Sequence, residues 1–367
     1  MLLYVLLFAY ATVCIVQTKE ALIDNKKVLI FFLLLPLFFI SAFRGISVGP
    51  DTHAYHFIYS SIARSESLFK AISSNRCEPG YVFINYIFSR FGLSYYYLQV
   101  FVSLFILVSI GLFLYRYSDD VCFSVFLLFA DCSFLGMMNV VRMWIAIAVL
   151  LFSVEALKSD SAWKFILIVL IACSFHYSSA LFIVMYPLMR MDLTKRRIVM
   201  ILFASLLLCL FVIPVFRLIT TIIGRYGGYI ESERFKLFGN LATILSLFVS
   251  LFFFAFESYE KAWIKDNHDE DGICISQHEY SVAYRAIIVA VAISIVGLSN
   301  NIMGRLIHYF SIFDLLLIPH AINRIEDTDN RILIRAAVVL IMLLEFIVIN
   351  LLRPDWYQVM PYSFFFM

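Results

Sequence analysis

The chain has 367 residues, of which 63% are hydrophobic and 15% are charged, and its mean hydropathy is +0.91. A soluble domain of this size cannot keep so much apolar side chain out of water, so the composition excludes a soluble globular protein and predicts a polytopic membrane protein. The formal net charge of +2 is small, and the lysines and arginines lie mostly in short loops, which excludes a nucleic-acid-binding surface.

The cysteines indicate neither a disulfide framework nor a metal centre. None of the seven lies in a CxxC pair or near two histidines, and most lie inside apolar runs, where a thiol packs as a small hydrophobic group. We therefore expect no metal and no other cofactor.

The apolar runs predict an all-α membrane protein with about twelve transmembrane segments, some of them short or broken. The first run lacks the basic start and the cleavage site of a signal peptide, so we expect it to be retained. No fixed-period repeat and no soluble domain is evident, so residues 1–367 are predicted to form one integral membrane domain. The predicted segments are residues 2–16, 28–43, 96–114, 121–135, 140–157, 163–189 as two short helices, 198–216, 241–256, 282–298, 302–318 and 333–352.

The basic residues predict the orientation. Lys19, Lys26 and Lys27 place the first loop in the cytoplasm, because cytoplasmic loops are enriched in lysine and arginine. Residues 44–79 then form an external loop, and residues 81–91 have helical apolar spacing but are too few to span, so they lie in the interface or re-enter the bilayer. Two more polar segments follow on this arrangement, an external amphipathic segment at 218–240 and an acidic cytoplasmic loop at 258–281.

The run 163–189 predicts a helix break. One continuous span would place Arg190 and the basic residues 195–197 outside, against the charge bias. A break at His176 removes this conflict, with Ser178 or Ser179 as the N-cap of the second helix.

The external loop supplies carboxylate and imidazole groups at the membrane boundary. Asp51, His53 and Glu78 could each take a proton from an incoming hydroxyl if held close to it in a dry site. The alternative for Asp51 is that it caps a helix beginning at Thr52 or His53. His176 could equally be a hydrogen-bonded packing residue.

Two arginines lie beside long apolar stretches. Leaving Arg142 unpaired in NVVRMWIAIAVLLF would cost several kcal/mol, so it needs an anion, either a ligand or an internal partner such as Asp131 or Glu155. Arg305 lies in a similar setting with Tyr309 one turn later, and snorkelling to the interface is its alternative role.

Six motifs together resemble the EpsG-type branch of the Wzy polysaccharide polymerases over nearly the whole chain. They are Arg44 with VGPDTHAY, EPGY from Glu78, VVRMWIAIA around Arg142, FHYSSAL from Phe175, RLIHYF from Arg305, and PY at Pro361.

The resemblance implies a bacterial inner-membrane glycosyltransferase of GT-C-like architecture. Such an enzyme joins undecaprenyl-diphosphate-linked oligosaccharide units at the periplasmic face during O-antigen or other surface polysaccharide synthesis, without a nucleotide sugar. The O-antigen ligases, which are similar in general architecture, also work without a metal. Membrane lipid, a chain-length regulator and a flippase are the partners it implies.

The resemblance also assigns roles to residues. It favours Asp51 or His176 as the catalytic base, with Glu78 next. Arginines bind a diphosphate bidentately, and tyrosine rings stack on sugars, although tyrosines more often serve as plain interface anchors. The expected diphosphate ligands are Arg142, Arg305 and Arg44, and the expected sugar contacts are His53, Tyr55, Tyr81 and Tyr309, with Tyr226 and Tyr229 as further stacking faces.

Two other functions compete with this one. A transporter or flippase of a lipid-linked or anionic solute also has intramembrane arginines and broken helices, but many transporters have two matching halves, which this sequence lacks. A membrane acyltransferase ranks third, because the sequence near its histidines supplies no clear HxxxxD pair.

Overall fold

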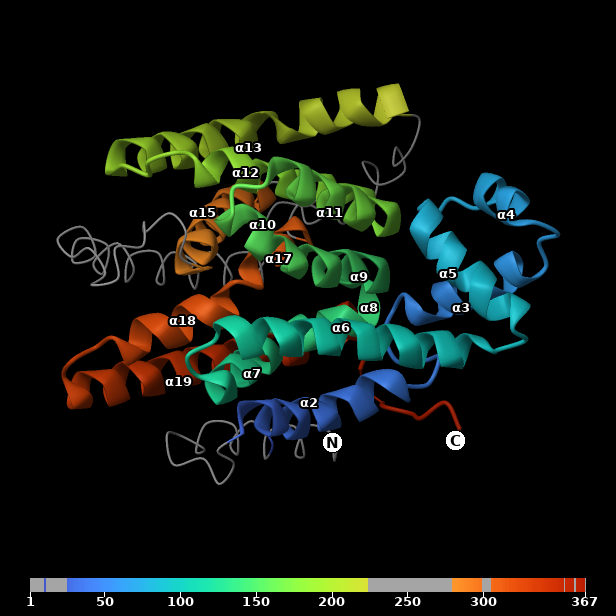
Figure 1. Cartoon of the computed structure of the whole chain (residues 1–367), viewed down its shortest axis with the longest axis horizontal. Coiled ribbons are helices and arrows are strands. Elements are labelled where there is room, and N and C mark those ends of the chain that lie inside the picture. The colour runs from blue at the N-terminus through green and yellow to red at the C-terminus, as the bar shows by residue number, and fades with distance from the viewer. Residues whose placement is uncertain are drawn as a thin grey trace. The chain divides into compact units, whose positions relative to one another are not determined.

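The computed structural model describes residue 10 and residues 25–223, 279–298, 305–352, 354–359 and 361–366. Within these ranges the chain is helical, with short 3-10 segments and one isolated β-bridge between Arg44 and Phe364, so the all-α prediction is confirmed (Figure 1). The described residues fall into two compact units, Met1–Ile183 with Ile322–Met367, and Val184–Ala321. The single integral membrane domain remains a prediction.

The helices of the first unit are α2 (Lys26–Ala42), α3 (Thr52–Ala63), α4 (Leu68–Ser74), α5 (Pro79–Arg90), α6 (Tyr95–Tyr117), α7 (Val121–Ala130), α8 (Ser133–Asn139), α9 (Val141–Leu150), η1 (Leu151–Ser153), α10 (Val154–Lys158), α11 (Ala162–Phe175), α19 (Thr328–Leu352) and α20 (Pro354–Tyr357). The second unit contains α12 (Met185–Met189), α13 (Lys195–Ile223), α15 (Glu279–Gly297), η6 (Arg305–Ile307), α17 (His308–Ser311) and most of α18 (Asp314–Asn323), and the 3-10 helix η2 (Tyr177–Val184) ends at the boundary.

Three described helices are long and apolar enough to cross a membrane, Tyr95–Tyr117, Tyr280–Gly297 and Thr328–Leu352, and the number rises to five if two bent helix pairs each count as one span. The prediction of a membrane protein therefore holds, whereas the count of about twelve segments and the GT-C-like architecture are not confirmed. Apart from residue 10, the predicted segment 2–16 lies outside the described residues. The same holds for 241–256 and for most of 218–240 and 258–281, with Tyr226 and Tyr229.

The predicted break at His176 is confirmed. Helix α11 ends at Phe175, and the backbone of His176 is extended, with φ −156° and ψ 115°. The predicted N-cap is wrong, because the next element is the 3-10 helix η2, which already begins at Tyr177 and so contains Ser178 and Ser179.

A second break was not predicted. Residues 121–135 do not form one helix, because α7 and α8 meet at an angle of 57° across Asp131 and Cys132. Cys132 has a positive φ of 61°, and the Asp131 carboxylate accepts hydrogen bonds from the backbone N and the Oγ of Ser133, each at 2.8 Å. A short carboxylate that bonds its own backbone competes with the helical hydrogen-bond ladder, which explains the break.

Helices α3, α4 and α5 pack around a small apolar core of Ile62, Ala71 and Val82, all fully buried. Helix α5 has 12 residues and so extends about 18 Å, well short of the roughly 30 Å of a bilayer core. The prediction that this stretch is helical but too short to span is confirmed.

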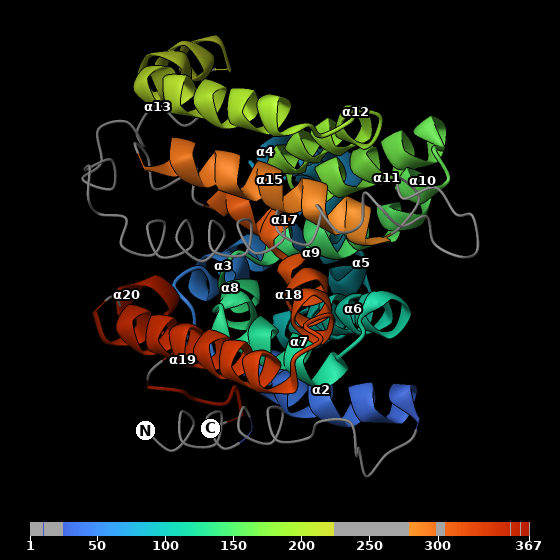
Figure 2. The same cartoon turned by 90° about the vertical axis from the view of Figure 1, so that its left-hand side faces the viewer.

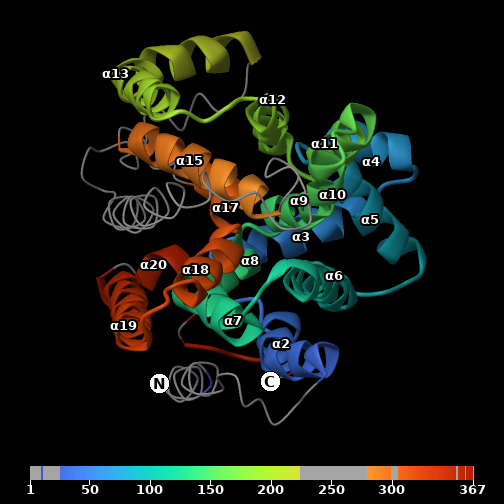
Figure 3. The same ribbon diagram turned by 60° about the vertical axis from the view of Figure 1, so that its left-hand side comes forward.

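Contacts among the helices of the first unit bring three helix ends together. Helix α5 packs on α3 and on α11, and α11 packs on α9, while α2 lies along α6 (Figures 2 and 3). This arrangement places the start of α5, the start of α9 and the end of α11 in one region.

An ion pair joins α7 to α19. The Arg335 Nη1 donates to the Asp120 Oδ2 at 2.7 Å, and Asp120 also caps α7 by accepting from the backbone N of Phe123 at 2.9 Å. Both side chains are mostly buried, at 16% and 17% exposure, so water only partly screens the pair.

We expect Arg335→Met to lower the free energy of unfolding by about 1–3 kcal/mol, because it leaves Asp120 with an unpaired buried charge. Thermal unfolding of the purified protein in detergent measures the effect. Arg331→Met, one turn earlier on α19, is the matched control and should change the midpoint little. Equal effects of the two substitutions would contradict the role of the ion pair.

Candidate active site

The three helix ends meet at the carboxylate of Glu78, which precedes α5 and is 2% exposed. Its Oε2 accepts a hydrogen bond from the Arg142 Nη1, which makes the contact an ion pair. Its Oε1 lies 3.0 Å from the Nδ1 of His176 and accepts from the backbone N of Tyr177 at 3.4 Å. We call Glu78, Arg142 and His176 the Glu78 triad.

Local sequence explains how each member reaches this point. Pro79 is suited to the first helical position and so ends the extended backbone that holds Glu78. At Gly80 a Cβ atom would lie 2.4 Å from the Ser174 Oγ and 2.8 Å from its carbonyl oxygen, so only glycine lets α5 approach α11 this closely. The helix break turns His176 toward Glu78.

The triad has a buried side and an accessible side. Burial alone would raise the pKa of Glu78, but the hydrogen bond from His176 and the charge of Arg142 outweigh it and bring this pKa below its ordinary value of 4.5. An ionised carboxylate has no proton to donate, so the Nδ1 of His176 carries the hydrogen in this contact. The side chains of Arg142 and His176 are 25% and 26% exposed.

Tyr55, on α3, lies beside Arg142. Its ring is 5% exposed and meets the Tyr81 ring edge to face, with centroids 5.7 Å apart. Burial raises the pKa of Tyr55 to about 12 against the opposing charge of Arg142, so the hydroxyl stays neutral at physiological pH. Both tyrosines are packed inside the protein and leave no free ring face.

The partners suggested for Arg142 were wrong. The Asp131 carboxylate accepts a hydrogen bond from the hydroxyl of Ser133. The Glu155 carboxylate accepts one from the hydroxyl of Tyr117 and forms an ion pair with Lys158 at 3.6 Å. Each of these carboxylates has a partner close at hand, whereas Glu78 is 64 positions from Arg142 in the sequence.

The remaining predicted residues lie as follows. Asp51 stands at the N-cap position of α3, which begins at Thr52 as predicted, but its side chain makes no capping bond. His53 is exposed on the first turn of α3. Arg305 is exposed and Tyr309 is buried, both in the second unit.

A family model for the EpsG family matches residues 27–364, nearly the whole chain. The chain belongs to the EpsG family. EpsG-like proteins are Wzy-type polysaccharide polymerases, so the resemblance found in the sequence is confirmed. Comparisons with curated proteins and with solved structures give no match.

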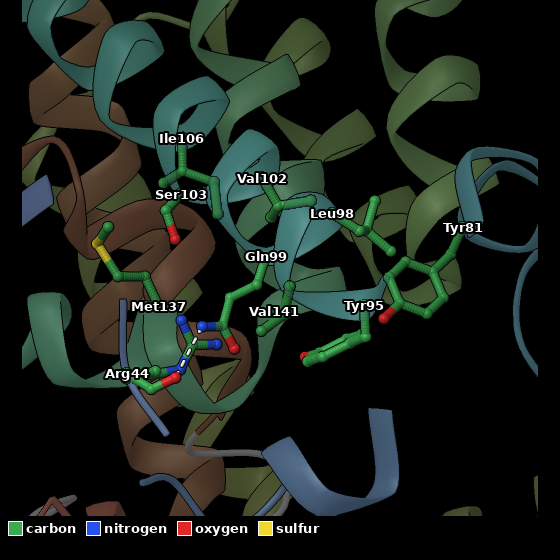
Figure 4. A pocket seen from close by; sticks show the side chains of 10 residues that line it. All are labelled: Arg44, Tyr81, Tyr95, Leu98, Gln99, Val102, Ser103, Ile106, Met137 and Val141. Atoms are coloured by element: carbon green, nitrogen blue, oxygen red, sulfur yellow. Dashed lines mark hydrogen bonds between the residues drawn. The ribbon is translucent and has the colours of Figure 1, made fainter. Parts of the chain in front are cut away.

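In this EpsG-family protein Arg44 differs from Arg142. It is 2% exposed, and its guanidinium donates to the carbonyl oxygens of Ser41 and, at 3.1 Å, of Met138. No carboxylate in the described part of the chain pairs with it. It lines a cavity of about 10 Å³, large enough for roughly one water molecule (Figure 4).

Gln99 lines the same cavity and was missed in the sequence. Its Nε2 donates to the carbonyl oxygens of Ala42 and Arg44, each at 2.9 Å, and so ties α6 to the end of α2 (Figure 4). A single glutamine inside the apolar stretch YYYLQVFVSLF is a signal that could have found it, because polar groups in such stretches have partners.

No group of three histidine, cysteine, aspartate or glutamate side chains suited to a metal ion occurs among the residues that the structure describes.

The pairing of Glu78 predicts a pH-dependent stability. A carboxyl whose pKa is lowered by folding stabilises the protein above its unfolded value of about 4.5, and this contribution is lost as the pH falls through the lower folded pKa. We expect Glu78→Gln to lower the melting temperature at pH 7, and the difference from the unsubstituted protein to shrink below pH 4.5. Thermal unfolding between pH 7 and about pH 3.5 measures this difference.

Glu66→Gln is the control for that experiment. Glu66 pairs with Lys70 at 2.9 Å, but its side chain is 81% exposed, so removing its charge should alter stability little at any pH. A Glu78→Gln effect that does not depend on pH would contradict the interpretation.

Proposed function

We propose that this protein is a lipid-diphosphate-dependent glycosyltransferase that polymerises undecaprenyl-diphosphate-linked oligosaccharide units. The observation that supports the proposal most is the Glu78 triad, in which an accessible imidazole is oriented by a buried carboxylate next to an arginine. Family membership supports polymerisation of a polysaccharide.

His176 is the proposed catalytic base. Its Nδ1–H bond to Glu78 fixes the ring orientation and the tautomer, so the neutral ring offers Nε2 as a proton acceptor. A carboxylate that orients an imidazole in this way also stabilises the imidazolium that forms. Glu78 then acts through His176, and Asp51, half-buried at the start of α3, is the second candidate for the base.

The proposed reaction transfers a glycosyl group from the lipid diphosphate to an acceptor hydroxyl. His176 takes the proton of an acceptor sugar hydroxyl as its oxygen attacks the anomeric carbon of the donor sugar. The bond from that carbon to the lipid diphosphate breaks, and the diphosphate leaves with both electrons. The transition state is oxocarbenium-like, so a nearby carboxylate stabilises the positive charge on the sugar.

Arg142 is the proposed ligand of the leaving diphosphate. Glu78 occupies Nη1, and the side chain is 25% exposed, so the guanidinium retains donors for phosphate oxygens. Arg305, which is exposed, remains a further candidate for diphosphate binding, whereas Arg44 is buried and bonded to carbonyl oxygens. His53, which is exposed, is the proposed sugar contact, whereas Tyr55, Tyr81 and Tyr309 are buried and offer no ring face to a sugar.

The proposed location is the bacterial cytoplasmic membrane, with the site on the periplasmic side. The support is the lysine distribution, which assigns the loop before α2 to the cytoplasm and so the loop after α2 to the outside. The proposed product is O-antigen or another surface polysaccharide, and the proposed architecture is GT-C-like. A flippase and a chain-length regulator are the proposed partners.

We expect the purified protein to convert a defined undecaprenyl-diphosphate oligosaccharide into a ladder of longer lipid-linked products without nucleotide sugar. His176→Gln should slow ladder formation by at least about 100-fold, since general-base catalysis contributes that much or more. Adding Glu78→Gln to it should have little further effect, because the two residues act as one unit.

His56→Gln is the matched control for the base, since His56 lies on α3 with its ring 5.4 Å from that of Tyr95. It should retain activity. Transbilayer movement of the lipid without a new glycosidic bond would favour the flippase instead, and an unchanged ladder in His176→Gln would move the base to Asp51.

The metal-independent mechanism makes a separate prediction. EDTA should leave the rate of ladder formation unchanged, because the arginine rather than a cation neutralises the leaving diphosphate. The same assay measures this. Loss of activity that is restored by a divalent ion would overturn the expectation.

A further inference from the structure

Residues 354–359 and 361–366, which we call the clasp segment, pair with the loop between α2 and α3. The backbone N of Gly45 donates to the Ser363 carbonyl at 2.7 Å, and that of Phe365 donates to the Phe43 carbonyl at 3.0 Å. Further along, the N of Gly49 donates to the Gln358 carbonyl at 3.1 Å. Backbone hydrogen bonds from the clasp segment, near the other end of the sequence, thus hold the loop that leads into α3.

Side chains add to this pairing. The ring of Phe365 stacks on Tyr96 of α6, with centroids 4.4 Å apart. The Tyr362 hydroxyl donates to the Ile40 carbonyl at 2.7 Å, and the hydroxyl oxygens of Ser47 and Ser363 lie 2.9 Å apart. The clasp segment therefore contacts α2, the loop and α6 at once.

The same region holds the end of α8. The Asn139 Nδ2 donates to the Trp356 carbonyl of the clasp segment at 3.3 Å, and the Arg44 guanidinium donates to the Met138 carbonyl at 3.1 Å. Gly49 also packs here, since a Cβ atom on it would lie 2.5 Å from the Asn139 Oδ1. The end of α8 is held by three separate contacts.

Only Val140 separates α8 from α9, and Arg142 is the second residue of α9. A shift of Asn139 therefore moves the backbone of Arg142 with it. His176, the partner of Glu78 that follows α11, has no such link to the clasp segment among the residues that the structure describes.

We infer that the clasp segment and Arg44 are positioning elements that keep the guanidinium of Arg142 on Glu78. This inference rests on the proposed function for its activity readout. It assigns to Arg44 and Ser363 an action through the loop and α8, without contact with the reacting atoms.

Within the described residues, the charged and titratable groups facing Glu78 are Arg142 from α9, His176 after α11, Tyr55 from α3 beside Arg142, and the neighbouring Cys77. Displacing Arg142 removes the one permanent positive charge among them. The pKa of Glu78 should then rise, so activity that needs its carboxylate should be lost at a higher pH.

Gly45→Ala tests the inference. A Cβ atom at Gly45 would lie 2.4 Å from the Ser363 Oγ, 3.3 Å from its Cβ and 3.2 Å from its carbonyl oxygen, so it pushes the clasp segment away. Gly45→Ala combined with Ser363→Gly removes two of these three contacts and should restore the pairing. Ser363→Gly alone is the control.

We expect Gly45→Ala to reduce the turnover of undecaprenyl-diphosphate oligosaccharide by about 10- to 100-fold, the scale of an ångström-sized misplacement. The acidic limb of its pH profile should move to higher pH, and the double substitution should reverse both changes. A loss of folded protein alone would lower the amount of active enzyme without moving the limb.

A second measurement does not require activity. The melting-temperature difference caused by Glu78→Gln at pH 7 should be smaller in the Gly45→Ala background, because Arg142 no longer pairs with the carboxylate. If the Gly45→Ala protein fails to insert into the membrane, Phe365→Ala is the second variant, because it loosens the clasp segment without adding atoms. It should move the acidic limb of the pH profile and reduce the melting-temperature difference in the same way.

The outcomes separate the two proposals. The unsubstituted protein could prove inactive while Gly45→Ala still reduces the melting-temperature difference caused by Glu78→Gln. This result would refute the proposed polymerase activity but support the positioning role. An active protein whose pH limb and melting difference are unchanged by Gly45→Ala would overturn the positioning role alone.

Discussion

A buried carboxylate is the constraint on which the rest of this structure depends. Glu78 is 2% exposed, and an ionised carboxylate removed from water costs several kcal/mol unless charged or hydrogen-bonding partners surround it. Arg142 and His176 meet that requirement from two other helices. The ends of α5, α9 and α11 must therefore stay together, and none of α5, α9 and α11 is among the described helices long enough to cross a membrane alone. Around Glu78, the structure therefore has short helices that share one polar contact instead of long membrane spans.

Much of the candidate site followed from sequence, but its connections did not. Arg142 needed an anion because its neighbours are apolar, and the charge bias of the loops located the break at His176. The partner of Arg142 could not be read from sequence distance, because the nearer carboxylates have other contacts in the fold. Asp131 bonds a serine, and Glu155 bonds a tyrosine and a lysine, so the distant Glu78 pairs with Arg142.

The fold, too, was predictable from sequence only in part. The apolar runs locate α2, α6, α15 and α19 closely, because a helix in lipid must be continuous and apolar. The bend between α7 and α8 escaped the hydropathy pattern, since Asp131 breaks the helix through a bond to its own neighbour while both flanks remain apolar. Gln99 and the clasp segment escaped it as well, because their contacts join parts of the chain that no local pattern relates.

Two arginines near one tyrosine show why residue type alone does not define a role. Arg44 and Arg142 both act electrostatically on Tyr55 or its neighbours, yet Arg44 is held by neutral carbonyls while Arg142 is held by a carboxylate. Neutral carbonyls leave the charge of Arg44 uncompensated within the described residues. The charges of Glu78 and Arg142 cancel, so the region keeps the positive charge of Arg44 and gains a second when His176 accepts a proton. On the proposed mechanism, this charge grows at the moment when the diphosphate departs with its electrons, and fixed positive charge stabilises a leaving anion most at that point. Arg44 can thus assist the reaction through its field while its two terminal nitrogens stay bonded to the carbonyl oxygens of Ser41 and Met138.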